Sequence, residues 1–329
     1  MNSPRVTVGM PAYNRAPVLG TSISQVLAQT FTDFEFIVYD DGSTDNTLAV
    51  ISEFADTRIK LVSKPNLGPP HPLNAILQLA VGEYIIIVHD HDFFHPTMLE
   101  KSVRALDENP DVGFVLQGSA WVGEDGVSSY REMLLDLPLI NNGLAIAKDL
   151  LLQPKSFNSF FHACSMVRKS TLVQAGYYYE VRFGLYADTD LWLRLLAISN
   201  FAYLPEVLFT FRTRETQGHF LSNREFEILK WLADIHRTNA ERIFVNEKAV
   251  SCKNLIERKW ARLNQRAVLM YAAAGNLGQT TNGLAICRTQ VDGNKMLGLL
   301  FWAVSMHRST IVLFVSVCHL MARMLKRVR

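Results

Sequence analysis

Cysteine is scarce in this chain of 329 residues, and its four copies stand far apart, at Cys164, Cys252, Cys287 and Cys318. No C-x-x-C pair occurs, so the sequence signals neither a zinc site nor a disulfide framework. Reduced thiols in a cytoplasmic setting are therefore the plain expectation. The opening MNSPRVTVGM lacks the apolar core of a secretory signal, so we expect no cleaved targeting segment there.

Glycine-rich phosphate loops are missing as well. The chain has no Gly-x-Gly-x-x-Gly and no Walker-type lysine loop, which excludes the common dinucleotide and P-loop fingerprints. It has no internal repeat, and a composition of 49% hydrophobic and 19% charged residues gives no sign of disorder. These absences leave a folded globular protein, either one large domain with an appendage or two modest domains.

Acidic residues disappear toward the C-terminus, and none follows Asp292. Residues 1–219 hold 16 Lys and Arg against 24 Asp and Glu, a balance of −8, whereas residues 220–329 hold 17 against 7, a balance of +10. Strand patterns fade after Pro205 and long helical patterns begin at Ser222, so a boundary is expected near residues 212–222. The predicted units are residues 1–218 and a basic, mostly helical C-terminal region, residues 219–329.

Short apolar or β-branched runs alternate with stretches of helical spacing through the first 120 or so residues. The runs are Val6–Met10, Phe34–Tyr39, Arg58–Val62, Tyr84–Val88 and Val112–Leu116. This alternation predicts an α/β fold with a mostly parallel sheet flanked by helices. In open sheets of this kind, ligands bind beyond the carboxyl ends of the strands.

Polar side chains gather where three of these strands end. The first ends in MPAYNRAP, which alone is an ordinary strand-to-helix turn. The second ends in Asp40-Asp41, more carboxylate than a helix cap needs, and a carboxylate can accept hydrogen bonds from a base or ribose. The fourth runs into His89-Asp90-His91-Asp92, which suits Mg²⁺ or Mn²⁺ bound to substrate phosphates. Together these turns indicate a nucleotide held through a metal and side chains.

Three segments of the chain, in this order and at this spacing, resemble the family 2 glycosyltransferases of the GT-A fold. They are VTVGMPAYNRAPVLGTSISQVLAQTFTDFEFIVYDDGSTDNT, GEYIIIVHDHDFFHPTML and YADTDLWLRLL, and the resemblance covers about residues 4–215. It implies a GT-A type nucleotide-binding sheet. It also implies inverting transfer of a sugar from a nucleoside-diphosphate sugar, with UDP or dTDP favoured, to a sugar or lipid-linked acceptor in polysaccharide or glycolipid assembly.

The resemblance assigns roles to the strand-end residues. Pro11, Tyr13 and Asp41 fall where the family holds the nucleotide base, with Asp40 beside them. Asp41 is the expected partner of a pyrimidine N–H group. These four residues are therefore the predicted nucleotide contacts from the first two strands.

The Asp-x-Asp motif of the family falls on Asp90 and Asp92. The resemblance implies that Asp92 ligates the divalent Mn²⁺ or Mg²⁺, and that Asp90 shares the metal and lies nearer the ribose. Counted from Gly82, however, His89 and His91 occupy two of the usual acidic positions. Alternatively, one of the two acids only caps the helix that follows Pro96.

Asp188 stands at the start of the helix predicted in YADTDLWLRLL, where an acid is favoured by the helix dipole in any case. The family places its general base here. The resemblance therefore implies that Asp188 accepts the acceptor proton in a single displacement with inversion. Asp190 is expected to be a structural neighbour.

Two features of many family members are missing. This chain reads Pro72-Leu73-Asn74 where many members read Ala-Arg-Asn, so a cation that could contact the diphosphate is absent. Lys64 and Arg212 are candidates to replace it. The Gln-x-x-Arg-Trp signature of processive synthases is also absent, which favours one sugar added per encounter.

Residues 293–329 combine six Lys and Arg with two apolar stretches, MLGLLFWAVSM and TIVLFVSVCHLMA. Each stretch falls short of the ~20 residues needed to span a bilayer. A peripheral position on the anionic inner face of the membrane and packing against the rest of the chain are equally compatible with this pattern. No nucleic-acid partner is expected, because no recognisable binding module interleaves aromatic and basic residues.

Two other functions stay open at this stage. A nucleotidyltransferase also binds nucleotides at sheet ends with metal-holding acids, and it would release pyrophosphate. A non-catalytic, membrane-associated nucleotide-binding module is the second alternative, because histidines stand in the metal motif.

Overall fold

The computed structural model describes residues 3–123, 125–152, 165–212 and 225–244, together with residues 254, 255, 258 and 260. By internal contacts the chain divides into two units, Met1–Gln217 with Asn239–Val245, and Gly218–Thr238 with Asn246–Arg329. All features of the sheet and the site described below belong to the first unit. The boundary expected near residues 212–222 stays a prediction, because much of the second unit lies outside the described residues.

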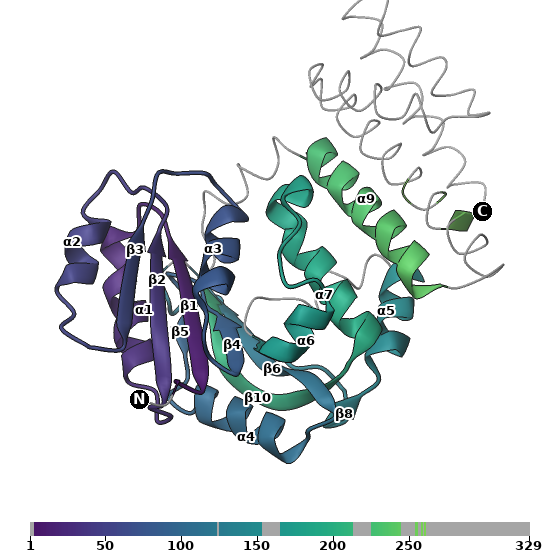
Figure 1. Ribbon diagram of the computed structural model, residues 1–329, viewed down its shortest axis with the longest axis horizontal. Coiled ribbons are helices and arrows are strands. Elements are labelled where there is room, and N and C mark those ends of the chain that lie inside the picture. The colour runs from purple at the N-terminus through teal and green to yellow at the C-terminus, as the bar shows by residue number, and fades with distance from the viewer. Residues whose placement is uncertain are drawn as a thin grey trace, which may run out of the picture. The chain divides into compact units, whose positions relative to one another are not determined.

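Strands and helices alternate along the first unit (Figure 1). The strands are β1 (Val6–Ala12), β2 (Phe34–Asp40), β3 (Ile59–Ser63), β4 (Tyr84–Ile87), β5 (Phe93–Phe94), β6 (Val112–Val122), β7 (Arg131–Met133), β8 (Ile140–Asn141), β9 (Met166–Arg168) and β10 (Asn200–Arg212). The helices are α1 (Ala16–Leu27), α2 (Thr47–Ser52), α3 (His71–Leu79), α4 (Met98–Glu108), α5 (Gly143–Leu152), α6 (Lys169–Gln174), the 3₁₀ helix η2 (Val181–Tyr186), α7 (Ala187–Ile198) and α9 (Glu225–Ile243).

The strands of the described residues form one sheet, ordered β3-β2-β1-β4-β9-β6-β10-β5, with β7 paired to β6 and β8 paired to β10 beside this path. β1 pairs in parallel with β2 and β4, β2 with β3, and β6 with β10. The antiparallel strands, such as β9 between β4 and β6, are short. The predicted α/β fold with a mostly parallel sheet and flanking helices is confirmed. Parallel pairing brings the carboxyl ends of β1, β2 and β4 to one edge, where the site is expected.

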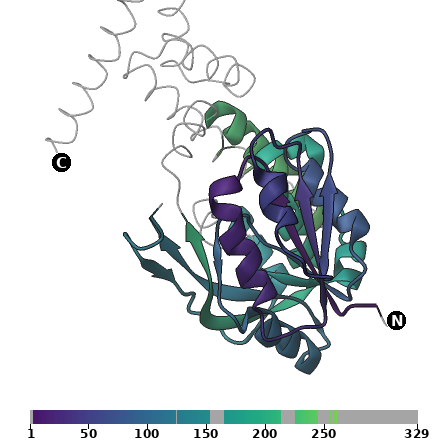
Figure 2. The ribbon, with the colours of Figure 1, turned by 90° about the vertical axis from the view of Figure 1, so that its left-hand side faces the viewer.

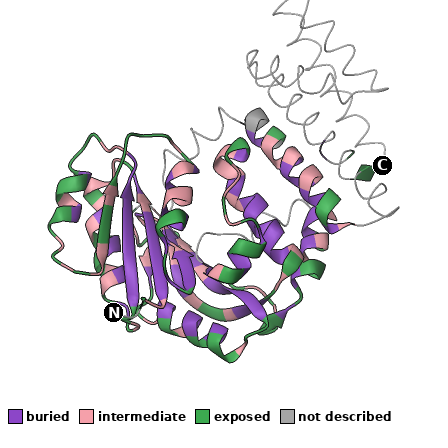
Figure 3. Ribbon diagram, viewed as in Figure 1, coloured by how far each residue is buried: buried purple, intermediate pink, exposed green. Residues whose placement is uncertain are grey.

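The central strands are buried on both faces, as parallel strands between helices are (Figure 3). In β2, Phe36 and Val38 join the main core with α1 and α4, whereas Ile37 and Tyr39 turn to the opposite face and pack with Ile76 of α3. Figure 2 shows α1, the purple helix, across its face of the sheet. The alternation of side chains along β2 therefore places α3 on the face opposite α1, and α3 borders the cavity described below.

The sequence interpretation that strand patterns fade after Pro205 is wrong for β10. The strand runs on to Arg212 and pairs with β6 throughout, with register shifts between Leu204 and Val207 and between Val207 and Phe209. Pro205 lacks an N–H group and cannot donate to a ladder, so it lies where the regular pairing is interrupted. The part of β10 after Pro205 places Arg212 at the site described below.

No helix among the described residues combines the length and the hydropathy that crossing a bilayer requires. The two apolar stretches of residues 296–306 and 310–322 lie outside the described residues.

Candidate active site

The turns after β1 and β2 bind each other. Asn14 has a positive φ of 52°, and its backbone N–H donates to Ser43 Oγ at 2.9 Å. Its side-chain oxygen accepts the N–H of Thr44 at 2.8 Å. Asp45 accepts N–H groups from both Ala16 and Thr47, at 3.1 and 2.9 Å, and so links the starts of α1 and α2. The predicted base-binding edge is thus a preorganised pair of turns, with Pro11 at the end of β1 and Tyr13 43% exposed.

Asp40 and Asp41 are almost fully buried, at 0% and 4% exposed. The Asp40 carboxylate accepts the Ser43 N–H at 3.2 Å and the Ser63 hydroxyl at 2.8 Å. Asp41 accepts the backbone N–H groups of Leu67 and Gly68, both at 3.1 Å. Both acids therefore hold the loops around the edge in place, and their contact with a nucleotide stays a prediction.

Four consecutive residues after β4 form a cross-linked group. His89 Nδ1 lies 2.9 Å from Asp92 Oδ2, and His91 Nδ1 lies 2.7 Å from Asp90 Oδ1. The two imidazoles stack with centroids 5.8 Å apart and an interplanar angle of 10°. Neither acid caps α4, since both carboxylates bond to these imidazoles instead. The histidines of the motif therefore serve as partners of its acids.

Charge within this group stabilises the ionised forms of His89 and Asp92. Burial is the largest single effect and opposes ionisation of both residues, but the hydrogen bond between them and the neighbouring charges together outweigh it. The pKa of His89 is raised, with the charges of Asp90 and Asp188 adding to the effect. The pKa of Asp92 is lowered, with the charge of His91 and the backbone N–H of Arg212 adding to it.

Two arginines border the same group. Arg15 Nε lies 3.1 Å from Asp90 Oδ2, and it comes from the β1–α1 turn. The backbone N–H of Arg212 donates to Asp92 Oδ1 at 2.9 Å, while its guanidinium lies 4.5 Å from the Phe93 ring centroid. Arg15 and Arg212 thus place positive charge at the edge where a diphosphate is expected.

Asp90 and Asp92, the acids after β4, can hold a divalent cation only together with a bound ligand such as a diphosphate. No group of three or more His, Cys, Asp or Glu in the described part of the chain is arranged to hold a metal. Mg²⁺ commonly takes only one or two carboxylates and completes its shell with water and substrate phosphates. Asp90 and Asp92 supply two carboxylates at the sheet edge, so their chemistry suits an Mg²⁺ or Mn²⁺ shared with a diphosphate.

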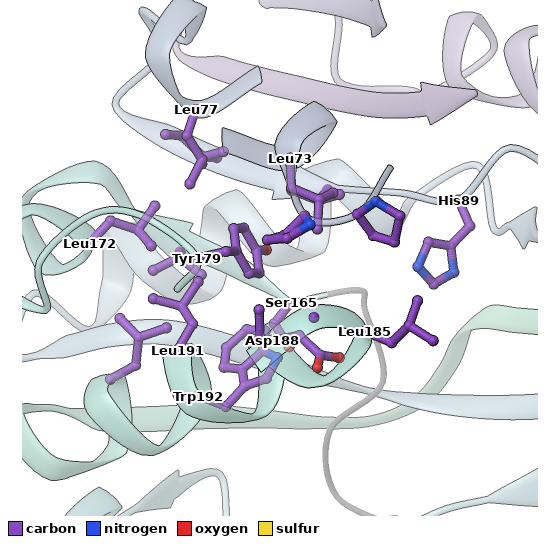
Figure 4. A pocket seen from close by; sticks show the side chains of 18 residues that line it. Leu73, Leu77, His89, Ser165, Leu172, Tyr179, Leu185, Asp188, Leu191 and Trp192 are labelled. Atoms are coloured by element: carbon purple, nitrogen blue, oxygen red, sulfur yellow. The ribbon is translucent and has the colours of Figure 1, made fainter. Parts of the chain in front are cut away.

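Asp188 lies in the first turn of α7, beside a cavity of about 160 Å³ (Figure 4). Its Oδ1 accepts the Thr189 N–H at 2.7 Å. Burial raises the pKa of Asp188, although the Thr189 N–H and the charge of His89 partly oppose the rise. His89 lines the same cavity, so the structure brings Asp188 next to the group after β4.

Asn74 positions the segment that precedes Asp188. Its side-chain amide donates to the Tyr179 carbonyl at 3.0 Å, and its side-chain oxygen accepts the Tyr179 N–H at 2.8 Å. Tyr177 adds a bond from its hydroxyl to the Leu77 carbonyl at 2.6 Å. Helix α3 therefore fixes the backbone that leads through η2 to α7.

Asp190 is completely buried and forms a polar network. It accepts Arg194 Nε at 2.8 Å and Asn239 Nδ2 at 2.8 Å, and Arg242 lies 3.4 Å away. Arg194 also donates to the carbonyls of Ala175 and Tyr178. This network ties α7 to Asn239 and Arg242 at the end of α9, which belong to the first unit, and to the loop after α6, which is a structural role.

Sequence reasoning gave no role to four residues of the site: Arg15, Ser165, Tyr179 and, as a cavity-lining group, His89. Arg15 and His89 stand inside quoted motifs, whereas Ser165 and Tyr179 carry no local signal. The segment FRTRETQGHF, residues 211–220, is described only as far as Arg212.

Residues 7–173 match the family described as glycosyl transferase family 2. The chain belongs to this family. It is 33% identical over 219 residues to the putative glycosyltransferase EpsE of Bacillus subtilis, a match that covers 64% of this chain and 74% of EpsE. It is 27% identical over 236 residues to the Escherichia coli UDP-Glc:alpha-D-GlcNAc-diphosphoundecaprenol beta-1,3-glucosyltransferase WfgD, covering 70% of this chain and 84% of WfgD.

Solved structures share the fold. Staphylococcus aureus TarS 1-349 in complex with UDP-GlcNAc aligns with a TM-score of 0.64 at 16% identity, covering 94% of this chain and 89% of that one. The mannosyltransferase PcManGT from Pyrobaculum calidifontis, in complex with GDP-Man and Mn²⁺, aligns with a TM-score of 0.54 at 18% identity, covering 97% and 88%. The chain spans 40% of the length of an uncharacterized glycosyltransferase from Rickettsia felis to which it is 28% identical. The expected GT-A fold and the glycosyltransferase class are confirmed.

Proposed function

We propose that this glycosyltransferase moves a sugar, with inversion, from a nucleoside-diphosphate sugar to the hydroxyl of a sugar or lipid-linked acceptor. The observation that carries the proposal is that Asp188 shares one cavity with His89, whose partner Asp92 belongs to the Asp-x-Asp motif. In this proposal the reacting sugar occupies the space between Asp188, as general base, and the group after β4, as diphosphate site. TarS bound to UDP-GlcNAc and the lipid-linked acceptor in the name of WfgD support this donor and acceptor class.

Each residue has a defined task in this reaction. Pro11, Tyr13, Asp40 and Asp41 form the edge that receives the nucleotide base, of which uracil or thymine is favoured. Asp188 accepts the proton of the acceptor hydroxyl as that oxygen attacks the anomeric carbon from the face opposite the diphosphate. This reaction needs only one carboxylate near the acceptor, whereas glycoside hydrolysis uses two around the sugar bond.

Asp90 and Asp92 would hold Mn²⁺ or Mg²⁺ together with the diphosphate. The bound cation would supply neutralisation of the charge that develops on the leaving group. Arg15 and Arg212, which border these acids, would add positive charge on the same side.

Thermal unfolding in the presence of UDP, dTDP, GDP or CMP, each with and without Mn²⁺, tests the nucleotide site. A ligand at ~100 times its dissociation constant should stabilise the fold by roughly 2.7 kcal/mol. We expect a rise with one pyrimidine diphosphate that depends on Mn²⁺ and is lost in Asp92→Asn. Asp33→Asn, an exposed acid just before β2, is the matched control and should keep the rise. No rise with any of the four would contradict the proposal. Release of pyrophosphate from the sugar nucleotide would indicate a nucleotidyltransferase instead.

We propose a cytoplasmic enzyme whose basic residues 293–329 bind the inner face of the membrane. Anionic headgroups attract such segments by about 1 kcal/mol for each Lys or Arg near the surface. Deleting residues 293–329 should therefore remove binding to phosphatidylglycerol vesicles in a sedimentation assay, while phosphatidylcholine vesicles should bind neither form. Binding that survives the deletion would assign the membrane contact to another part of the chain.

A further inference from the structure

The cavity beside Asp188 is mostly apolar. Two leucines of α3 line one side, and residues of α7 line the other (Figure 4). Its apolar lining includes Leu73, Leu77, Leu172, Leu191, Trp192 and Leu195. None of the described residues that line it is a lysine or an arginine. A fully hydroxylated, hydrophilic group would lose its water here without finding a partner for each hydroxyl.

The position of the cavity decides which part of a substrate can enter it. His89 bonds to Asp92 and also lines the cavity, so the cavity begins where the diphosphate site ends. Asp188 borders the same space. A sugar attached to a diphosphate at Asp90 and Asp92 would therefore lie next to this cavity, since His89 joins the two.

The size and the polar atoms of the cavity suit one sugar ring. A cavity of about 150 Å³ can hold benzene, also a six-membered ring, and this one measures about 160 Å³. Ser165 is 5% exposed, and its hydroxyl finds no hydrogen-bond partner among the described residues. Burial raises the pKa of Tyr179, so its hydroxyl keeps its proton and can donate. Leaving the buried Ser165 hydroxyl without a partner costs folding free energy, unless a ligand forms a hydrogen bond with it.

We propose that this cavity is the subsite of the donor sugar and that it selects a sugar carrying a methyl group. Ser165 and Asp188 face the hydroxyls of the ring, and the leucines of α3 and α7 enclose the methyl. The methyl belongs either to C6 of a 6-deoxy sugar or to an N-acetyl group. The inference rests on the proposed function, because it takes the diphosphate to bind at Asp90 and Asp92.

Calorimetric titration of the full chain with matched ligands, in Mn²⁺, tests this subsite. UDP-glucose against UDP-N-acetylglucosamine measures the effect of an N-acetyl group in place of the C2 hydroxyl, and dTDP-glucose against dTDP-6-deoxyglucose measures the effect of a methyl in place of the C6 hydroxymethyl. An apolar pocket discriminates one methyl or methylene by roughly 10-fold or more. We expect the methyl-bearing sugar to bind about 10-fold tighter in one of the two pairs.

Variants separate the sugar subsite from the nucleotide site. Leu73 is half-buried, so Leu73→Gln should fold, and it should abolish the preference between the matched sugars while UDP and dTDP bind as before. Leu79→Gln is the matched control, because Leu79 lies on the same helix, is 45% exposed and does not line the cavity. Leu73→Ser repeats the test with a smaller polar side chain. Ser165→Ala should weaken the sugar nucleotides several-fold but leave the diphosphates unchanged.

The outcomes distinguish the two proposals. Equal binding within both pairs, by a protein that does bind UDP or dTDP, would overturn the sugar subsite and leave the proposed function intact. Tighter binding of the sugar without the methyl, or a preference that survives Leu73→Gln and Leu73→Ser, would overturn it as well. Failure to bind any of these nucleotides would overturn both.

Discussion

Replacing Asp188 by asparagine should lower sugar transfer by roughly two to four orders of magnitude, the usual contribution of general acid–base catalysis. Asparagine keeps the size of the side chain but cannot accept the proton of an attacking hydroxyl. The diphosphate site after β4 stays intact, so nucleotide affinity should not change. Release of the nucleoside diphosphate from the preferred donor, measured at saturating acceptor, gives the rate.

Stability provides the control for this variant. Burial raises the pKa of Asp188, which means that the folded chain disfavours the charge at this position. Removing the charge should therefore leave the unfolding temperature unchanged or raise it, so lost activity cannot be attributed to unfolding. Asp33→Asn, which alters an exposed acid, should behave like the wild type in both assays. Near-normal turnover by Asp188→Asn would remove Asp188 from the catalytic role.

The same raised pKa predicts the pH dependence of the reaction. Only the deprotonated carboxylate can accept a proton, so transfer should fall as the pH falls through the pKa of Asp188. Because burial moves that pKa above its ordinary 3.8, the acid limb of kcat/KM should lie above the value of an exposed aspartate. An acid limb at or below 3.8 would contradict the assignment.

The fold was largely predictable because its signals are local. Each of the five predicted strands is present, four of them within two residues of the expected bounds, since apolar runs between turn formers mark buried strands, whereas β6 runs past the predicted Leu116 to Val122. β10 was missed beyond Pro205 because a proline normally ends a strand pattern, and here long-range pairing with β6 carries the strand past it. The short antiparallel strand β9 likewise gains its place from its neighbours β4 and β6.

The site was predictable only where a motif carried it. Asp90, Asp92 and Asp188 come from quoted motifs, and the structure brings His89 of the first motif and Asp188 to one cavity. Ser165 and Tyr179 line that cavity without any local pattern, because β9 and the loop held by Asn74 place them there. Such contacts depend on the packing of segments that are far apart along the chain, which periodicity and spacing do not report.

Replacing Asp190 by alanine should destabilise the first unit by about 3–5 kcal/mol, the usual cost of removing one partner of a buried ion pair. Asp190 is 0% exposed and Arg194 is 8% exposed, and the loss would leave the guanidinium of Arg194 buried without its carboxylate. Arg242 would lose its nearby anion too. Urea unfolding, followed by tryptophan fluorescence, measures the change.

An exposed pair provides the matched control. Glu83 has a side chain that is 57% exposed and lies 3.5 Å from Arg5. Glu83→Ala should cost no more than about 1 kcal/mol, because water screens such pairs and replaces their contacts. If Asp190→Ala unfolds at the same urea concentration as Glu83→Ala, the buried network does not hold α7.

The Asp190 network also bears on catalysis, since α7 carries Asp188 two residues earlier. In the absence of urea, Asp190→Ala should remain folded, but its less ordered α7 should misplace Asp188. We therefore expect a lower kcat, while the affinity for the nucleoside diphosphate stays constant. Arg194→Lys separates the two effects, because lysine keeps the charge near Asp190 but cannot also donate to the carbonyls of Ala175 and Tyr178. A lysine variant with full activity would show that charge alone orders the helix, and one as impaired as Asp190→Ala would show that the bonds to the loop after α6 do.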